Sequence, residues 1–289
     1  MQRILAFIAA VALATAIAAP ASAAARKMVV PAHGATLDVS IQVGKGEGPR
    51  PVLVVFHGFP GAADAPDLSE FTDKGWTVVY PHYRGIWGST GEFGIANSEA
   101  DGKAVVAWLR SRATELSIDP GRIGVIGMSY GGWVALRVAA ADPSIVCTAG
   151  MTPADMGFIG SRWAAEPAYR AFWLADVASL ATHPKKPLRL GAAGPDGFLD
   201  EAARNAVSFG LRASATAFAG RPVFLSGGSK DDVTPFAEHY LPLSQALRDA
   251  GARLTAIELP MGHESSSVDS AALVAWVEAN CGGAPATAG

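Results

Sequence analysis

Short, mainly apolar runs alternate with helix-patterned stretches along most of this chain of 289 residues. Runs of this kind are typical of strands that are buried on both faces of a sheet. Strands that alternate with helices form right-handed βαβ units, so the sequence predicts an α/β fold around a mainly parallel sheet. The five runs span residues 52–56, 76–80, 123–126, 223–225 and 254–259.

Local patterns predict further elements. Polar and apolar residues alternate within residues 29–43, which predicts an antiparallel hairpin. Ser98 and Asp101 have the spacing of a capping pair, which predicts that a helix begins there. Residues 236–250 have a helical pattern, and the glycine at position 251 is expected to end that helix.

Residues 152–219 interrupt the alternation. They contain no clear buried-strand run, but they carry aromatic residues at roughly helical spacing. Connections in α/β units are usually only about 2–6 residues long. We therefore interpret this segment as a helical cap insertion over the carboxyl edge of the sheet, within one domain that spans residues 24–289. Surface helices that only complete the fold are the alternative.

The first 23 residues have the pattern of a cleavable signal peptide. Arg3 supplies the positive charge, residues 4–19 form an uncharged apolar run, and Pro20 precedes the small residues Ala-Ser-Ala. The alternative is a membrane anchor, but the apolar run is shorter than the roughly 20 residues that span a bilayer. We expect residues 1–23 to be removed, which predicts a secreted or periplasmic protein without a stable membrane anchor.

Charge and cysteine content narrow the expected partners. Removal of residues 1–23 leaves 22 basic and 26 acidic side chains, a net charge of −4. This weak acidity is not typical of a protein that binds nucleic acid. Cys147 and Cys281 remain, and in an oxidising compartment such a pair suggests a disulfide. Two buried free thiols are the alternative.

The most specific motif is G-M-S-Y-G at residues 127–131. It has the form G-x-S-x-G, and it lies after a predicted buried strand and before a predicted helix. In that position the motif places its serine on a strained strand-to-helix turn with the hydroxyl exposed. We therefore predict that Ser129 is a nucleophile; a turn whose serine only caps the next helix is the alternative.

These features resemble the α/β-hydrolase superfamily, most of all its prolyl-oligopeptidase-like and dienelactone-hydrolase-like branches. Residues 83–93 resemble the Y-R-G-x-G-x-S loop of those branches, with one additional residue. The resemblance implies the α/β-hydrolase fold, with an eight-stranded, mostly parallel sheet. It also implies a catalytic triad in the chain order serine, aspartate, histidine.

A nucleophilic serine needs a base, and His263 is the strongest of six histidines. It lies after the last predicted strand in the sequence P-M-G-H-E, which resembles the superfamily's catalytic-histidine loop. His239 is the rival candidate. Because His239 falls inside a predicted helix, we expect it to pack or to cap instead.

The acid is expected in the sequence G-S-K-D-D-V-T-P at residues 228–235, which resembles the superfamily's G-x-x-D-x-x-V-P turn. The resemblance assigns the role to Asp231. The neighbouring Asp232 stays open as the alternative, and whichever carboxylate is not the acid would favour the N-terminus of the following helix.

Residues 56–61 resemble the superfamily's H-G-x-P loop, which follows the first buried strand. This resemblance implies an oxyanion hole made by two backbone N–H groups, those of Phe59 and Tyr130. His57 is expected to stabilise this loop rather than to take part in catalysis. No histidine or cysteine spacing indicates a metal site, and no phosphate-binding glycine motif indicates a nucleotide, so no cofactor is expected.

The predicted function is therefore a serine hydrolase of the carboxylesterase type, which cleaves an ester or related acyl bond of a small-molecule substrate through an acyl-enzyme. A peptidase, an aminopeptidase-like enzyme or an acyltransferase with the same triad is the main alternative. A non-catalytic binding protein with this fold is the other. Arg84 and Arg162 are candidates to bind a substrate carboxylate, with ordinary surface arginines as the alternative. The oligomeric state does not follow from the sequence.

Overall fold

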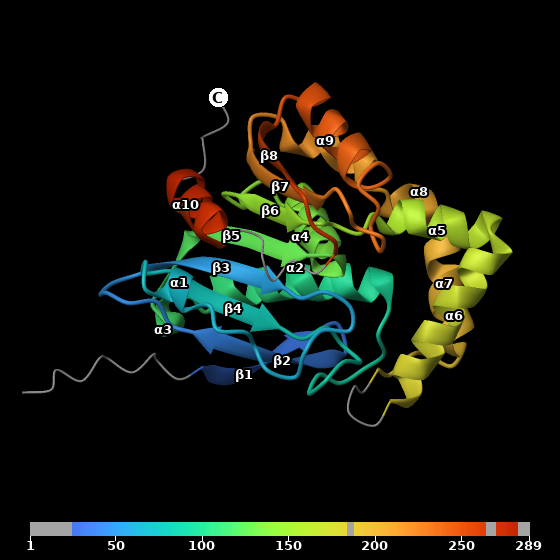
Figure 1. The fold of residues 1–289 in the computed structure, drawn as a ribbon. Helices are drawn as coiled ribbons and strands as arrows, with labels where there is room; N and C mark the ends of the chain where they lie inside the picture. The colour runs from blue at the N-terminus through green and yellow to red at the C-terminus, as the bar shows by residue number, and fades with distance from the viewer. Residues whose placement is uncertain (1–24, 184–187, 264–269, 283–289) are drawn as a thin grey trace, which may run out of the picture.

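The computed structural model describes residues 25–183, 188–263 and 270–282. The predicted signal peptide, residues 1–23, lies outside the described residues. One sheet of eight strands forms the centre of the molecule (Figure 1), with the strand order β1-β2-β4-β3-β5-β6-β7-β8. The strands are β1 (Arg26–Ala32), β2 (Ala35–Gln42), β3 (Arg50–Phe56), β4 (Thr77–Pro81), β5 (Ile118–Met128), β6 (Thr148–Met151), β7 (Pro222–Gly228) and β8 (Arg253–Leu259).

The pairing directions confirm an eight-stranded, mostly parallel sheet. Strands β1 and β2 form the predicted antiparallel hairpin, and β2 also pairs antiparallel with β4. Every pair from β4 through β3 to β8 is parallel. The parallel strands therefore end along one edge of the sheet, and the loops that follow them are brought together there.

Helices cover both faces of the sheet and create two apolar cores. On one face α2, α4 and α9 pack over the larger core, which includes Val105, Trp133 and Leu247. On the other face α1 and α10 pack over a smaller core, which includes Phe71 and Trp276. These helices and the short α3 are α1 (Ser69–Thr72), α2 (Ile95–Ser111), α3 (Ala113–Leu116), α4 (Tyr130–Ala141), α9 (Tyr240–Asp249) and α10 (Ser270–Cys281).

The burial of the strands matches the predicted runs except at one edge. Every residue of β4 and β7 is buried, as expected for strands covered on both faces. Strand β8 contains the run 254–259, but its residues are only partly buried or exposed. It is the last strand of the sheet, so the expectation of a fully buried strand was wrong there.

The predicted start of the second helix is also wrong. Helix α2 begins at Ile95, and Ser98 lies within it with its hydroxyl bonded to the Gly94 carbonyl. The carboxylate of Glu201, a residue from α7, instead accepts hydrogen bonds from the Ile95 and Ala96 N–H groups at 2.9 and 2.8 Å. A side chain more than a hundred residues away thus satisfies the first donors of this helix.

Helix α9 is shorter than predicted. It begins at Tyr240, not at residue 236, and residues 233–239 form turns. Pro242 consequently lies in the first turn of the helix, where a missing N–H group costs no intrahelical hydrogen bond. Gly251 has a φ of 74° just beyond the helix, as expected for the residue that ends it.

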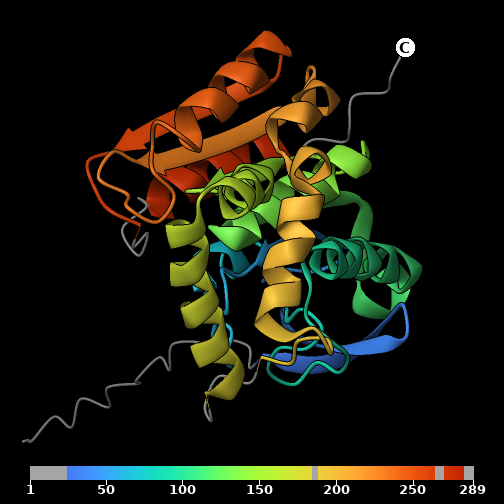
Figure 2. The ribbon, with the colours of Figure 1, turned by 90° about the vertical axis from the view of Figure 1, so that its right-hand side faces the viewer.

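The segment between β6 and β7 is helical throughout most of its described length. It lies beyond the end of the sheet toward which the parallel strands point (Figure 1), and Figure 2 views the molecule from that side, with α6 and α7 next to each other. Its elements are α5 (Met156–Ala165), α6 (Pro167–Thr182), α7 (Gly194–Arg204), α8 (Ala206–Phe209) and the 3₁₀ helix η1 (Arg212–Phe218).

The two cysteines form a disulfide. Cys147 precedes β6, Cys281 ends α10, and their Cα atoms are 5.2 Å apart. Both side chains are buried in the smaller core. The bond therefore joins the last helix to the centre of the sheet and closes a loop of 134 residues.

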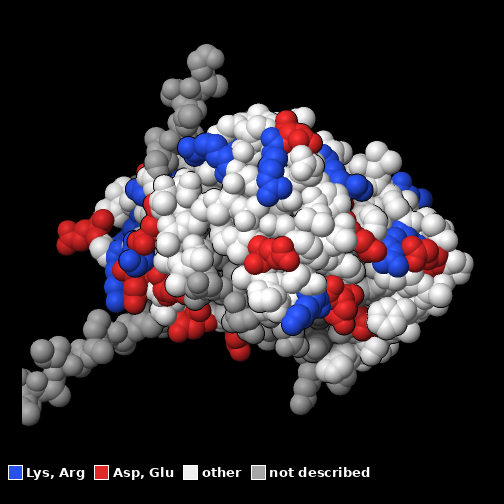
Figure 3. Space-filling model, turned by 45° about the horizontal axis from the view of Figure 1, so that its top comes forward, with Lys and Arg blue, Asp and Glu red and all other residues white. Residues whose placement is uncertain are grey.

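Charged side chains of both signs are interspersed on the face shown in Figure 3. Ion pairs on the surface of the protein include Arg110 with Asp142 and Lys45 with Asp73. Among the helices that the structure describes, none combines the length and the apolar character needed to cross a bilayer.

Candidate active site

Ser129 lies on the sharp turn between β5 and α4. Its backbone has a φ of 56° and a ψ of −122°, values that non-glycine residues rarely adopt. A Cβ atom on Gly127 would lie 2.1 Å from the Gly131 carbonyl oxygen, and one on Gly131 would lie 2.1 Å from the Phe56 carbonyl oxygen. Both flanking positions therefore require glycine, because neighbouring backbone fills the space of a side chain.

The structure brings together the three residues of the predicted triad. The Ser129 Oγ atom is 2.9 Å from Nε2 of His263. On the other side of the imidazole, Nδ1 is 2.8 Å from Oδ2 of Asp231. Asp231 and His263 lie 102 and 134 positions after the serine in the chain, and they form one chain of hydrogen bonds with it at the edge where β5, β7 and β8 end. This geometry allows the histidine to accept the serine proton while the carboxylate holds the imidazole.

Asp231, rather than Asp232, is the carboxylate that faces the histidine. Burial opposes ionisation of Asp231, but hydrogen bonds from His263 and Thr234 outweigh it and hold the pKa of this carboxyl group below its usual value. Asp232 is exposed, and His263 is paired with its neighbour. The structure therefore favours the first of the two alternatives.

Thr234 is a site residue that the sequence reasoning missed. Its N–H donates to Oδ1 of Asp231 at 2.8 Å, and its hydroxyl donates to Oδ2 at 2.7 Å. The same hydroxyl is 3.2 Å from Nδ1 of His263. The V-T-P sequence was a signal for the turn, but nothing in it indicated that the threonine side chain would contact both members of the pair.

His239 does not compete for the role of the base. It is buried just before α9, and its Nδ1 atom accepts a hydrogen bond from the Asp155 N–H group at 3.0 Å. Burial lowers the pKa of this imidazole to about 4. Its neutral ring also packs edge-on against Phe158, which fits the expectation that His239 has a packing role.

The loop after β3 brings Phe59, one of the two predicted oxyanion donors, next to the serine. A Cβ atom on Gly58 would lie 3.6 Å from the Ser129 Cβ atom, so this loop runs directly beside the nucleophile. Phe59 and Tyr130 both line the cavity that contains Ser129. Tyr130 is the first residue of α4, so its N–H has no carbonyl partner within the helix.

His57 stabilises this loop from within. Its Nδ1 atom is 2.6 Å from the Gly58 carbonyl oxygen, and its ring packs against Tyr83 with ring centroids 4.4 Å apart. Burial lowers the pKa of His57 to about 3, so the ring is neutral at physiological pH and donates through Nδ1. These contacts agree with the expectation that His57 stabilises the loop.

A cavity of about 320 Å³ opens onto the serine and the histidine. The helical segment between β6 and β7 supplies most of its wall, and the side chains there are mainly aromatic or aliphatic. Asp176 of α6 adds one carboxylate to this wall. Its apolar wall residues include Met156, Ile159, Trp163, Trp173, Val177 and Phe198.

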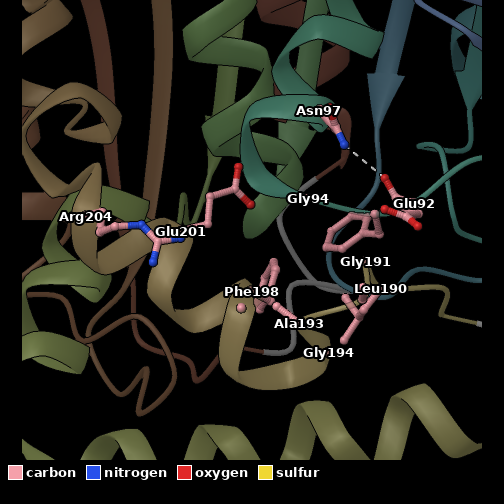
Figure 4. A pocket seen from close by; sticks show the side chains of 13 residues that line it. Glu92, Gly94, Asn97, Leu190, Gly191, Ala193, Gly194, Phe198, Glu201 and Arg204 are labelled. Carbon is pink, nitrogen blue, oxygen red and sulfur yellow. Dashed lines mark hydrogen bonds between the residues drawn. The ribbon is translucent and has the colours of Figure 1, made fainter.

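A second hollow of about 310 Å³ lies on the other side of Phe198, which lines both cavities. Figure 4 shows this hollow between the beginning of α2 and the glycine-containing loop before α7. Its Asn97 side chain donates to the Glu92 carbonyl oxygen at 3.0 Å, and Glu201 uses its carboxylate to cap α2. The side chains of Asn97 and Glu201 in this hollow are therefore engaged in hydrogen bonds that stabilise the start of α2 and the loop before it.

The two arginines that were candidates for substrate binding have other partners. Arg84 is buried and donates to both oxygens of Asp101, from its side chain and from its own N–H group. Arg162 pairs with Glu166 and lies over the Tyr169 ring at 3.9 Å. Neither side chain is among those that line the cavity at Ser129.

Three buried histidines, His57, His82 and His239, have pKa values lowered by burial, which predicts a strong acid sensitivity of the fold. An unfolded histidine binds a proton near pH 6.5, but folded His57 and His239 bind theirs only near pH 3 and pH 4. Between these values the unfolded state holds more protons, so stability falls as the pH falls. Lowering the pH from 7 to 5 is expected to cost roughly 2 kcal/mol for each of His57 and His239.

Urea unfolding at pH 7, 6 and 5 measures this effect. His239→Asn keeps an acceptor for the Asp155 N–H group but cannot titrate, so it should reduce the loss of unfolding free energy by the roughly 2 kcal/mol expected of this one histidine. The same loss in both proteins, or no loss in the wild type, would contradict the assignment.

Comparison with known proteins places the chain in a family. Residues 33–180, just over half of the chain, match the family model for X-Pro dipeptidyl-peptidase (S15 family). Cocaine esterase from Rhodococcus sp. (strain MB1 Bresler) is 31% identical over 116 residues, which cover 38% of this chain and 20% of the esterase. This chain thus spans about a fifth of that relative.

Solved structures show the same fold at low sequence identity. The acylaminoacyl peptidase of Pyrococcus horikoshii is 16% identical with a TM-score of 0.65, over 89% of this chain and 41% of the peptidase. Est1E from Butyrivibrio proteoclasticus is 14% identical with a TM-score of 0.61, over 87% of this chain and 96% of Est1E. Because the family model matches more than half of its residues and its sheet has the expected architecture, the chain belongs to the S15 family of the α/β-hydrolase superfamily.

Proposed function

We propose that this protein is a serine hydrolase that cleaves a carboxylic ester through an acyl-enzyme. One observation carries the proposal: a serine held at a positive φ is hydrogen-bonded to a histidine, which is hydrogen-bonded in turn to a buried carboxylate. A serine hydroxyl is a poor nucleophile unless a base removes its proton, and this arrangement supplies the base and its orienting group.

In the proposed reaction, Ser129 Oγ attacks the acyl carbonyl carbon while Nε2 of His263 takes the hydroxyl proton. Asp231 holds the proton on Nδ1 and stabilises the imidazolium that forms. The oxyanion accepts hydrogen bonds from the N–H groups of Phe59 and Tyr130. His263 then passes its proton to the leaving alcohol, and a water molecule, activated by the same histidine, hydrolyses the acyl-enzyme.

The cavity supports an ester as the substrate. Its wall next to Ser129 is mainly aromatic and aliphatic, which favours an apolar acyl or alkyl group of a small molecule. An alcohol leaving group needs less acid assistance than an amine. The names of two similar proteins, cocaine esterase and Est1E, point in the same direction.

A peptidase is the second candidate, and one observation favours it. Asp176 is an exposed carboxylate in the mainly apolar wall of the cavity, and it forms no salt bridge with the residues that the structure describes. Such a carboxylate suits an ammonium group, as the free amino end of a peptide would supply. The matching family is named for an X-Pro dipeptidyl-peptidase, and the similar Pyrococcus horikoshii protein is an acylaminoacyl peptidase. An acyltransferase would use the same triad.

Labelling combined with a substrate panel tests the proposal. A fluorophosphonate probe is expected to modify wild-type protein at Ser129 and to leave Ser129→Ala unmodified. p-Nitrophenyl esters with short to medium acyl chains should be cleaved faster than aminoacyl p-nitroanilides. Faster cleavage of the anilides would favour the peptidase, and labelling without turnover of either would favour a transferase. No labelling at Ser129 would support a non-catalytic binding protein.

We also infer export of the protein, with residues 1–23 removed. The disulfide between Cys147 and Cys281 supports an oxidising compartment, because cytosolic thiols are kept reduced. The mass of the protein recovered from its cells should correspond to a chain that begins near residue 24. A full-length mass would contradict the inference.

A further inference from the structure

Three side chains hold the carbonyl groups of the loop that carries the Phe59 N–H group. His57 Nδ1 is 2.6 Å from the Gly58 oxygen, and His82 Nε2 is 3.0 Å from the Ala62 oxygen. Between them, Trp87 donates its indole N–H to the Pro60 oxygen at 3.2 Å. Alternate carbonyls of residues 58–62 are thus each bound, and two of the three partners come from the loop after β4.

We propose that Trp87 is a positioning residue for the oxyanion hole, an inference that rests on the proposed function. Trp87 falls in the stretch where this chain has one residue more than the Y-R-G-x-G-x-S pattern. Its backbone has a φ of 48°, a conformation that costs energy for a bulky residue and persists only where the surroundings hold it. In this conformation the indole N–H of Trp87 donates to Pro60 in the loop after β3.

The Pro60 carbonyl is an effective point at which to hold this loop. The proline ring already restricts the φ of residue 60, so a hydrogen bond to its carbonyl oxygen restrains the remaining torsion, ψ. Phe59 then lies between two held carbonyls, those of Gly58 and Pro60. In a planar trans peptide the Gly58 oxygen and the Phe59 N–H point in opposite directions, so holding the oxygen orients the donor.

The tryptophan ring also supports the second anchor from the same loop. Its centroid lies 6.4 Å from that of His82, which is buried and bound to the Ala62 oxygen. Trp87 itself is only partly buried and is absent from the residues that line the cavity at Ser129. It therefore acts on the oxyanion donor through the loop and does not touch the substrate.

Trp87→Phe tests this inference, because it removes the N–H group and retains an aromatic ring. A net hydrogen bond corresponds to about a threefold to tenfold change in rate, so kcat should fall by that factor while KM changes less than twofold. Trp108→Phe is the matched control, since Trp108 lies on α2 near Pro31 and His33 instead of near the loop. It should leave both constants unchanged.

A pair of substrates separates positioning from a general structural effect. A p-nitrophenyl ester and its thionoester differ only in the atom that becomes the anion, and sulfur accepts N–H hydrogen bonds weakly. If the hole is disturbed, the preference of the wild type for the oxygen ester should shrink in Trp87→Phe by the same factor as kcat. Trp87→His, which retains a ring N–H, should recover part of the preference.

Several outcomes would overturn the inference. An unchanged kcat in Trp87→Phe would contradict it, as would equal losses on the ester and the thionoester. If Trp87→Phe does not fold, Trp87→His is the deciding variant. If Trp87→His prefers the oxygen ester over the thionoester as strongly as the wild type, although its ring N–H makes no hydrogen bond to the Pro60 oxygen, the result would count against the role. Wild-type protein without any turnover would overturn the proposed function together with the role of Trp87, whereas turnover that the variants leave intact would overturn only the latter.

Discussion

Alanine in place of Ser129 or His263 is expected to lower kcat on a p-nitrophenyl ester by about 10⁴-fold or more. The reason is that the two side chains act as one unit: His263 Nε2 is 2.9 Å from the hydroxyl whose proton it would remove. Without the base the serine is a weak nucleophile, and without the serine the base has nothing to activate. The double variant should therefore be hardly less active than either single variant, which steady-state kinetics on purified protein will measure.

The neighbouring aspartates offer a matched control for the same prediction. Asp231→Asn keeps the shape of the side chain but favours the wrong imidazole tautomer, and a loss of about 10⁴-fold in kcat is expected. Asp232→Asn makes the same chemical change one residue away, on an exposed side chain, and should retain near wild-type activity. Equal losses in both variants, or a larger loss in Asp232→Asn, would contradict the observed pairing of His263 with Asp231.

Removal of the disulfide is expected to have the largest effect on stability. The bond between Cys147 and Cys281 closes a loop of 134 residues, so the crosslink removes much conformational freedom from the unfolded chain. The loop-entropy relation gives roughly 5 kcal/mol for a loop of this length. The double variant with alanine at both positions should therefore unfold at a much lower urea concentration than the wild type.

A reductant separates the crosslink from the packing of the two side chains. A phosphine reductant should lower the free energy of urea unfolding of the wild type and leave that of the double alanine variant unchanged. Both cysteines are buried, so any additional difference between the reduced wild type and the variant reports the cavities left by the missing sulfur atoms. A wild type that resists urea equally with and without reductant would show that the crosslink adds little.

Most of the sheet could be predicted from the sequence because the strands are buried. A strand covered on both faces must be apolar nearly throughout, so β3, β4, β5 and β7 each produced a recognisable run. Strand β8 produced a similar run but lies at the edge of the sheet. The run alone does not indicate how many neighbours a strand has.

The residues placed at the centre of the site could be predicted for a different reason. Ser129 must sit on a tight turn between β5 and α4, and the glycines that this turn requires leave a motif in the sequence. His263 and Asp231 follow strand ends, and they could be predicted because their loops resemble the corresponding loops of the superfamily. Thr234 and Trp87 have no such signature, because their importance comes only from hydrogen bonds to groups in other segments.

The sequence by itself determined the parallel sheet, the turn that presents Ser129, and the candidates for its partners, because burial and tight turns restrict residue types locally. Only the tertiary structure decided between Asp231 and Asp232, paired the cysteines, and placed the walls of the cavity. It also moved the start of α2 from Ser98 to Ile95, since the carboxylate that caps this helix belongs to Glu201. Contacts between distant segments depend on how the helices pack, and no local pattern of residues records them.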